Sequence, residues 1–434
     1  MAAPDDSYRP KSTREDAAAV VRRLREAGHV AYLAGGCVRD LLLQMQPKDF
    51  DVATDAPPQR VRDLFRNTQA VGAAFGVILV RLGQSQIEVA TFRVESGYAD
   101  GRHPSQVQFA TAQEDARRRD FTINGLFLDP INDQVIDYVG GQEDLKARQI
   151  RAIGNPAERF AEDSLRLLRA VRFSARLAFQ IEPATAAAIV AHAPQLKRVS
   201  PERIAEELRI MLTPVTRRPA WRMLWDLKLV ATLMRFLKAT ARTDDDFRPR
   251  LFDMLAPAVT IPFSLALAGA VVCYRLRADA RITDPRQLFD RHEVHAAVQA
   301  MRQSLRISNE ESDQMHGTLH GLWPLLADEF PRVAKLKRFL AEPTASLSRK
   351  LMNALADIGI EDRQIARLNL ELDRLSKTEF SPKPFVDGDA LTALGLSPGP
   401  IFKRILTDVY DAQLEGQVTA REDAIALALK IAGK

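Results

Sequence analysis

Two carboxylates stand one residue apart in the segment Asp49-Phe50-Asp51, which begins the β-rich stretch DFDVAT. Side chains alternate between the two faces of a strand, so this spacing predicts that both carboxylates point to the same side. Two carboxylates held together repel each other unless a cation lies between them, and Mg²⁺ prefers such oxygen ligands together with substrate phosphates. The pair therefore predicts a Mg²⁺ site; the alternative is an Asp-x-Asp on a solvated surface.

A glycine pair and an arginine precede the acidic pair in the segment GGCVRDLLL. Gly35 and Gly36 lead from a strand predicted over 30–36 into a helix, and they let a polyphosphate approach the backbone N–H groups where that helix begins. Arg39 lies in the first turn, where a guanidinium can pair with phosphate oxygens. Together with the acidic pair, these residues predict a metal–triphosphate site of the kind that phosphoryl-transfer enzymes use.

Other charged residues follow in the first 130 positions. Glu88 interrupts an apolar run in the hairpin predicted from VILVRL and IEVATF, and it is either a third metal ligand or an edge-strand charge that faces water. The basic run in DARRRDFTING ends at Arg119, which can hold phosphate or sugar. Asp120 and Asn124 can hydrogen-bond a ribose hydroxyl or brace the loop.

The segment ERFAEDSLRLLRAVRFSARLAF (158–179) is predicted as one helix with a charged residue at every third position. These residues are Asp163, Arg166, Arg169 and Arg172. Steps of three residues drift by about 60° on a helix, so neighbours share a face and the arginines can converge on an anion. A carboxylate only accepts hydrogen bonds and a guanidinium only donates them. We hypothesise that Asp163 and Arg166 read the amine donor and ring-nitrogen acceptor that cytosine and adenine share, and reject guanine and uracil.

Four motifs, in this order and at these intervals, resemble those of the class II tRNA nucleotidyltransferases, the CCA-adding enzymes, which share their catalytic head with bacterial poly(A) polymerases. The motifs are LAGGCVRDLLL, DFDVAT, RRRDFTINGL and EDSLRLLRAVRF. The resemblance is dense over residues 30–180 and weaker to the end of the chain. It implies that Asp49 and Asp51 are catalytic and bind Mg²⁺, and that Gly36 and Arg39 contact the triphosphate. It further implies that the nucleotide is bound by Arg119, Arg169 and Arg172 and that its base is selected by Asp163 and Arg166.

The resemblance also implies a function: addition of C and A from CTP and ATP to the 3′ end of tRNA, with release of pyrophosphate. The alternatives are a poly(A) polymerase, a CC-only or A-only tRNA nucleotidyltransferase, an RNA-binding protein with an inactive head, and an HD-type phosphohydrolase. Poly(A) polymerases of this family carry a basic pair where residues 71–80 have none, and the loop 95–104 favours addition of A as well as C.

The implied fold is α+β, with an N-terminal nucleotidyltransferase (polymerase beta-like) α/β head followed by all-α domains. The expected domains are a head over 1–150, a base-selecting neck over 151–215, a degenerate HD-like body over 216–345 and a tRNA-binding tail over 346–434. In the body, Cys273-Tyr274 stands where an HD domain has its His-Asp metal pair. We therefore interpret the nearby histidines as surface or core residues, not metal ligands: His292, His295, His316 and His320.

Composition sets broad limits on this interpretation. The chain has 434 residues, of which 46% are hydrophobic and 27% charged, as in ordinary globular proteins of more than one domain. A net charge of +5 permits a nucleic-acid partner such as the tRNA acceptor arm. Only two cysteines and a polar N-terminus are typical of a cytoplasmic protein. The longest apolar run, 263–274, is too short to span a membrane and predicts a buried helix.

Overall fold

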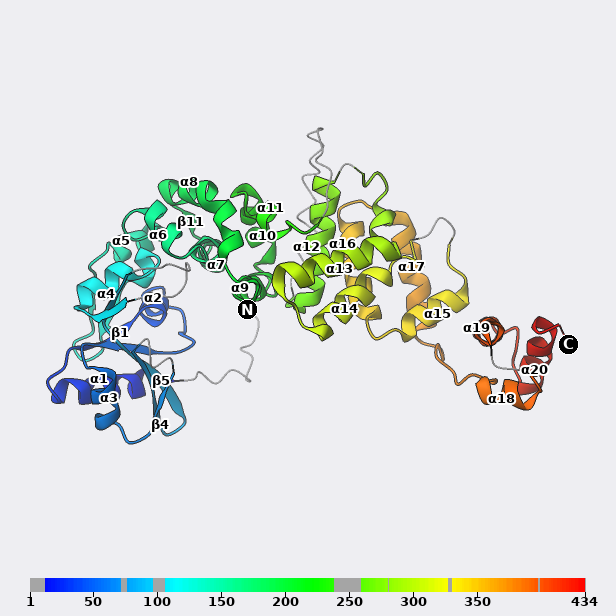
Figure 1. Ribbon diagram of the computed structural model, residues 1–434, viewed down its shortest axis with the longest axis horizontal. Helices are drawn as coiled ribbons and strands as arrows, with labels where there is room; N and C mark the ends of the chain where they lie inside the picture. The colour runs from blue at the N-terminus through cyan, green and yellow to red at the C-terminus, as the bar shows by residue number, and fades with distance from the viewer. Residues whose placement is uncertain are drawn as a thin grey trace. The chain divides into compact units, whose positions relative to one another are not determined.

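The computed structural model describes residues 12–71, 76–96, 106–237, 259–279, 281–326, 330–396 and 399–433. By its internal contacts the chain divides into two compact units. Unit 1 comprises residues 1–211 and 222–233, and unit 2 comprises residues 212–221 and 234–434. All three sheets belong to unit 1, and the described part of unit 2 is helical (Figure 1). The predicted α+β class, with a mixed head and a helical remainder, is confirmed.

Unit 1 is built around a seven-stranded mixed sheet with the order β3-β4-β5-β2-β1-β8-β9. Its strands are β1 Ala31–Ala34, β2 Asp51–Thr54, β3 Thr68–Ala70, β4 Val77–Leu82, β5 Ser85–Thr91, β8 Phe127–Asp129 and β9 Gln134–Ile136. Only β2 and β5 run parallel; the other neighbours are antiparallel. Two smaller sheets pair β6 Arg93–Ser96 with β7 Gln106–Phe109, and β10 Gln149–Ile150 with β11 Gln180–Ile181.

The helices of unit 1 begin and end where local sequence signals stand. They are α1 Arg14–Glu26, α2 Gly36–Leu42, α3 Pro58–Leu64, α4 Ala112–Arg118, η2 Thr122–Asn124, α5 Gly141–Lys146, α6 Pro156–Glu162, α7 Arg166–Leu177, α8 Pro183–His192, η3 Ala193–Arg198, α9 Pro201–Leu212, α10 Arg217–Asp226 and α11 Leu229–Leu233, with α9 and α10 reaching into unit 2. Thr13 caps α1 by accepting a hydrogen bond from the Asp16 N–H, and Thr111 forms a capping box with Glu114 at α4. Pro58 occupies the first turn of α3, where its missing N–H costs nothing.

A compact aromatic core fixes α4 against the sheet. Phe92 and Phe127 pack edge to face at 5.8 Å, and Ala112 and Ala116 of α4 lie against them. Ala53 of β2 belongs to the same cluster. Because side chains alternate along a strand, Asp51 projects from the same face as Ala53. The face of the sheet that carries Asp51 is therefore the face on which α4 packs.

Two sequence predictions are corrected here. The strand predicted to begin at Asp49 begins at Asp51, so Asp49 lies in the connection that precedes β2. The single helix predicted over 158–179 is two helices, because α6 ends at Glu162 and α7 starts at Arg166. Asp163 adopts an extended conformation between them (φ −143°), and its carboxylate accepts a hydrogen bond from the Leu165 N–H, which stabilises the turn.

The helices of unit 2 are α12 Phe263–Ala278, η5 Pro285–Phe289, α13 Arg291–Leu305, α14 Asn309–His320, α15 Val333–Ala341, α16 Ala345–Asp357, α17 Asp362–Leu375, α18 Gly388–Ala393, α19 Pro400–Leu414 and α20 Arg421–Ile431. The apolar run predicted as a buried helix is α12, in which Leu267 and Cys273 have no exposed surface. No helix in the described ranges has the length and apolar content required to cross a membrane.

The histidines of unit 2 lie on α13 and α14. The rings of His316 and His320 stack at 5.5 Å, one helical turn apart. Burial, followed by the charges of His320 and His295, lowers the pKa of His316. Across the part of the chain that the structure describes, no three His, Cys, Asp or Glu residues form a group that could hold a metal. Cys273 is instead a core residue whose sulfur accepts a hydrogen bond from the Trp221 indole.

Candidate nucleotide site

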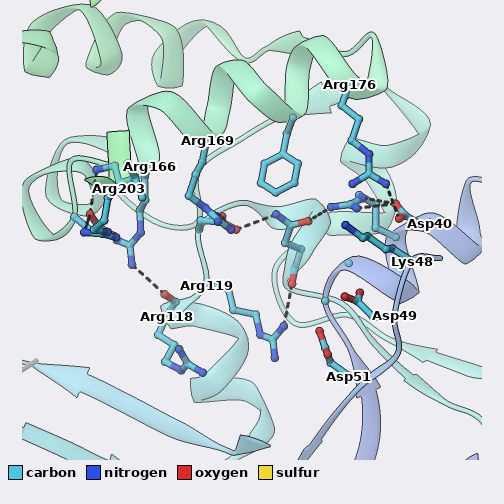
Figure 2. Close-up of a pocket in the computed structure, with 18 residues that line it drawn as sticks. Asp40, Lys48, Asp49, Asp51, Arg118, Arg119, Arg166, Arg169, Arg176 and Arg203 are labelled. Atoms are coloured by element: carbon cyan, nitrogen blue, oxygen red, sulfur yellow. Dashed lines mark hydrogen bonds and ion pairs between the residues drawn. The ribbon is translucent and has the colours of Figure 1, made fainter. Parts of the chain in front are cut away.

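Every residue predicted for the site except Arg172 lines one cavity of about 570 Å³ in unit 1 (Figure 2). These residues are Gly35, Gly36, Arg39, Asp49, Asp51, Arg119, Asp120, Asn124, Asp163, Arg166 and Arg169. They come from the start of α2, the start of β2, the end of α4 with η2, and the α6–α7 junction. The cavity thus brings together segments separated by more than a hundred positions.

Gly35 turns the chain from β1 into α2. Its φ of +75° lies in a region that favours glycine, and its N–H donates to the Leu126 carbonyl of the neighbouring segment at 3.0 Å. A Cβ added at Gly35 would lie 2.8 Å from Nη1 of Arg119. The backbone conformation therefore favours glycine, and a side chain at this position would also displace the end of an arginine that lines the cavity.

We expect Gly35→Ala to lower the free energy of unfolding by about 2 kcal/mol, because the side chain adds backbone strain and displaces the Arg119 guanidinium. Urea unfolding of the purified variant measures this loss. Gly83→Ala is the matched control, since Gly83 also has a positive φ (+57°) but has no atom within 4 Å of the added Cβ. Equal losses in the two variants would contradict a role for the close contact with Arg119.

Arg39 lies in the floor of the cavity with 3% of its surface exposed. Its Nε and Nη2 atoms donate to Asp40 Oδ1 at 2.8 and 2.6 Å, and its Nη1 donates to Asn124 Oδ1 at 2.6 Å. Asp40 also accepts from Arg176 of α7 at 3.0 Å. The Arg39 guanidinium, which was predicted to pair with phosphate, is thus engaged by protein partners that join α2 to α7.

Asp49 and Asp51 both turn their carboxylates into the cavity (Figure 2). Burial, reinforced by the charges of Asp49 and Glu88, raises the pKa of the Asp51 carboxyl to about 7. Glu88 acts from β5, whose register places Val89 beside Val52 and hence residue 88 beside residue 51. A nearby cation stabilises the ionised form of such a carboxyl group, so the Asp49–Asp51 pair fits a divalent metal ion.

Glu88 itself is exposed. Among the described residues, no three His, Cys, Asp or Glu side chains are arranged so that they could hold a metal ion, and Asp49, Asp51 and Glu88 are no exception. The structure therefore shows a pair of inward-facing carboxylates with a third acidic residue nearby. It does not assemble a three-ligand site from them.

Asp120 and Asn124 connect the floor of the cavity to α7. Asp120 accepts hydrogen bonds from Arg169 Nε at 2.8 Å, Asn124 Nδ2 at 3.0 Å and the Phe121 N–H at 2.8 Å. Asn124 in turn accepts from Arg39. Of the two possibilities left open by the sequence, the side chains form the brace, although both residues also line the cavity.

The Asp120 network has a consequence for acid stability. Burial raises the pKa of the Asp120 carboxyl, but Arg169, Asn124 and the Phe121 N–H outweigh it and lower that pKa to about 2, below the ordinary 3.8. A depressed pKa in the folded state stabilises the protein above pH 3.8, and this contribution is lost as the pH falls through 2. We expect Asp120→Asn to lower the free energy of unfolding by about 2 kcal/mol at pH 7 and by progressively less toward pH 2.

Urea unfolding between pH 7 and pH 3 tests this expectation. Asp63→Asn serves as the control because Asp63 is exposed on α3. A difference between wild type and Asp120→Asn that stays constant over this pH range would contradict the assigned network.

Asp163 and Arg166 line the part of the cavity formed by the α6–α7 junction, and each forms hydrogen bonds with partners of its own. Arg166 Nη1 donates to Glu162 Oε2 at 2.7 Å and to the Arg159 carbonyl at 2.8 Å. Asp163 accepts two hydrogen bonds from Arg203 of α9. The two residues thus share one wall although they do not share a helix.

Arg172 is the predicted site residue that does not line the cavity. Its Nε atom pairs with Glu207 Oε2 at 2.9 Å, and its guanidinium lies 4.5 Å from the centre of the Phe173 ring. Glu207 belongs to α9, so the Arg172 side chain contacts that helix, and its role in binding the nucleotide stays a prediction.

Seven lining residues escaped the sequence analysis: Asp40, Lys48, Arg118, Leu165, Phe173, Arg176 and Arg203. Lys48 carried the clearest signal, since a basic residue directly before an acidic pair suits a triphosphate beside a metal. Asp40 and Arg176 are 136 positions apart, and their contact depends on how α2 and α7 meet. Only the tertiary structure places such residues together.

Comparisons with known proteins agree with this architecture. Residues 31–151 match the family model "Poly A polymerase head domain", and residues 178–240 match "Probable RNA and SrmB-binding site of polymerase A". A CCA-adding enzyme of Enterococcus faecalis is 46% identical over 204 residues, which are 47% of this chain and 50% of that protein. Poly(A) polymerase I of Escherichia coli O157:H7 is 48% identical over 208 residues, 45% of either chain. This chain therefore spans about half the length of the curated relatives it matches.

Solved structures extend the similarity over the whole chain. The crystal structure of a Bacillus stearothermophilus CCA-adding enzyme in complex with CTP matches with a TM-score of 0.70 and 25% identity, covering 97% of this chain and 98% of that one. The likeness covers both the mixed-sheet head and the helices that follow it. These comparisons relate the chain to CCA-adding enzymes and to bacterial poly(A) polymerases.

Proposed function

We propose that this protein adds C and A, from CTP and ATP, to the 3′ end of tRNA. The observation that carries the proposal is the cavity that brings the carboxylate pair Asp49 and Asp51 together with the base-reading candidates Asp163 and Arg166. The similarity to a CTP-bound CCA-adding enzyme over nearly the whole chain supports it.

In the proposed reaction the 3′-hydroxyl of the RNA attacks the α-phosphorus of the nucleotide, and pyrophosphate leaves. Asp49 and Asp51 would hold Mg²⁺, which when bound neutralises phosphate charge and orients the triphosphate. Lys48, Arg118, Arg119 and Arg176 line the same cavity and would bind phosphate oxygens, while Arg169 would fix the nucleotide against α7. Gly35 and Gly36 would let the triphosphate approach the backbone at α2.

The base would be chosen by hydrogen bonding. An ionised carboxylate at Asp163 accepts from the exocyclic amine of cytosine or adenine, and the Arg166 guanidinium donates to the ring nitrogen beside that amine. Guanine and uracil present a carbonyl and a ring N–H at these positions. Their carbonyl would face the Asp163 carboxylate, which also only accepts, and their ring N–H would face the Arg166 guanidinium, which also only donates. These unpaired contacts disfavour the binding of guanine and uracil.

The domain layout is part of the proposal: a catalytic head over 1–150, a neck over 151–215, a degenerate HD-like body over 216–345 and a tail over 346–434. The head match over residues 31–151 and the polymerase RNA-binding match over 178–240 support the first boundary. The neck, body and tail would bind the tRNA acceptor arm, and a tRNA-processing role would place the protein in the cytoplasm.

A poly(A) polymerase is the second candidate, because the head is as similar to Escherichia coli poly(A) polymerase I as to CCA-adding enzymes. The two sequence features that favoured CCA addition, in residues 71–80 and 95–104, lie partly outside the described residues, which omit 72–75 and 97–105. A tRNA that ends at its discriminator base, incubated with CTP and ATP separately and together, distinguishes the candidates. Addition of CCA supports the proposal, a long adenosine tail supports the polymerase, and CC or A alone identifies a partial activity.

A further inference from the structure

Arg203 of α9 lines the wall of the cavity beside Arg166 (Figure 2). Its Nη1 donates to Asp163 Oδ1 at 3.2 Å, and its Nη2 donates to Asp163 Oδ2 at 2.8 Å. The two parallel bonds form a fork-to-fork pair between residues 40 positions apart in the sequence. The side chains are 20% and 17% exposed, so water screens this pair less than it screens surface pairs.

The pair leaves a defined acceptor on Asp163. An ionised carboxylate has about four acceptor sites, two on each oxygen. Oδ1 accepts from Arg203 and from the Leu165 N–H, so both of its sites are used. Oδ2 accepts from Arg203 at one site. In the contacts that the structure gives, one acceptor site on Oδ2 therefore remains for a ligand.

The same helix contacts α7 a second time, one turn further along. Glu207 is buried on α9, pairs with Arg172 at 2.9 Å and lies 3.7 Å from Arg169. Residues 203 and 207 are spaced i, i+4 and so lie on one face of α9. That face thus contacts the α6–α7 junction through Arg203 and the middle of α7 through Glu207.

We propose that Arg203 is a positioning residue for base selection, and that it acts only through Asp163. It fixes the plane of the Asp163 carboxylate so that one Oδ2 acceptor meets the exocyclic amine of cytosine or adenine. Without the fork the Leu165 N–H alone holds the carboxylate, its plane is less well fixed, and the preference for an amine over a carbonyl decreases. This inference rests on the proposed nucleotide-binding function of the cavity.

A double-mutant cycle tests the inference, because residues that act as a unit have non-additive effects. In the wild-type background, Arg203→Met is expected to lower kcat/KM for CTP and ATP by about 10- to 100-fold, which is the range for a lost charged hydrogen bond. The ratio of kcat/KM for CTP and ATP to that for UTP and GTP should decrease by a similar factor. In Asp163→Asn background, the same change is expected to alter the preference by less than about twofold. Arg203→Lys should restore part of the preference, since a lysine keeps the charge without the fork.

Arg198→Met is the matched control, because it removes the same charge from an exposed position five residues before Arg203. It should leave the preference among the four nucleotides unchanged. Thermal unfolding of each variant identifies general destabilisation. If Arg203 only ties α9 to α7, Arg203→Met loses stability or activity for all four nucleotides equally, and that result would overturn the proposal.

Equilibrium binding of the four nucleoside triphosphates, measured by calorimetry without RNA, separates this inference from the proposed function. The protein could fail to extend tRNA while Arg203→Met still loses the binding preference for CTP and ATP. That result would support the role of Arg203 and show that the proposed acceptor is wrong. Equal affinities of wild type and Arg203→Met for CTP and ATP would overturn the role of Arg203, whatever the acceptor.

Discussion

Asparagine at position 49 or 51 is expected to lower the rate of nucleotide incorporation by about 10²- to 10³-fold, the usual loss when one electrostatic stabiliser of a transition state is removed. The carboxylates of Asp49 and Asp51 face the same cavity, and an amide there no longer attracts a divalent cation. Incorporation of CMP into a tRNA without its 3′ end, at saturating CTP and Mg²⁺, measures the effect. Asp63→Asn on the exposed surface of α3 should retain full activity.

The same substitution at position 51 should stabilise the metal-free protein, which separates loss of activity from misfolding. The pKa of the Asp51 carboxyl is raised to about 7 in the folded state, above the ordinary 3.8, so ionisation destabilises the fold as the pH rises through this interval. Asp51→Asn removes that cost. We expect its free energy of unfolding in EDTA to exceed that of wild type at pH 8 and to approach it near pH 4. A variant that is both inactive and less stable at pH 8 would contradict this account.

Asp163→Asn is expected to reduce the preference for CTP and ATP over UTP and GTP by about 10- to 100-fold, the usual range for one base-specific pair of hydrogen bonds. An amide offers a donor as well as an acceptor, so it can face the carbonyl of uracil or guanine. Ratios of kcat/KM for the four nucleotides measure the change. Asp163 suits this test better than Arg166, because Arg166 also holds Glu162 and the Arg159 carbonyl, and its loss affects stability.

A matched substitution on α6 controls for this test. Glu158 is exposed and lies five residues before Asp163, so Glu158→Gln should keep wild-type selectivity. If Asp163→Asn has the same ratios of kcat/KM for the four nucleotides as wild type, the hypothesis that the Asp163 carboxylate reads the base is wrong.

Elements with local signals were predictable from the sequence. Thr13 begins α1, Pro58 begins α3, and the two runs after residue 76 form the β4–β5 hairpin. These signals act through neighbouring residues, so the rest of the chain hardly alters them. The motifs that carry the site were also recognisable, since their spacing is set by the start of α2, the start of β2 and the end of α4.

Features that depend on distant partners were not predictable. Strands β8 and β9 are three residues each; β8 becomes a strand because β1 offers Leu33 and Ala34 as pairing partners, and β9 because it pairs with β8. The break at Asp163 interrupts a sequence with unbroken helical periodicity, and it is stabilised in part by Arg203, far along the chain. Arg39 was interpreted from its first-turn position alone, without the Asp40 and Asn124 side chains that engage it.

The short parallel ladder between β10 and β11 restricts how the cavity can adapt. Gln149 and Ile150 pair with Gln180 and Ile181, so the chain leaving the head and the chain leaving α7 are joined side by side. Helix α7 is thus anchored to the head close to its C-terminal end, in addition to the Asp120–Arg169 bridge nearer its start. A rigid-body swing of α7 away from the head would break both attachments. If the cavity takes both CTP and ATP, as proposed, we expect the larger purine to be accommodated by rotamer changes of the lining side chains and not by a movement of α7.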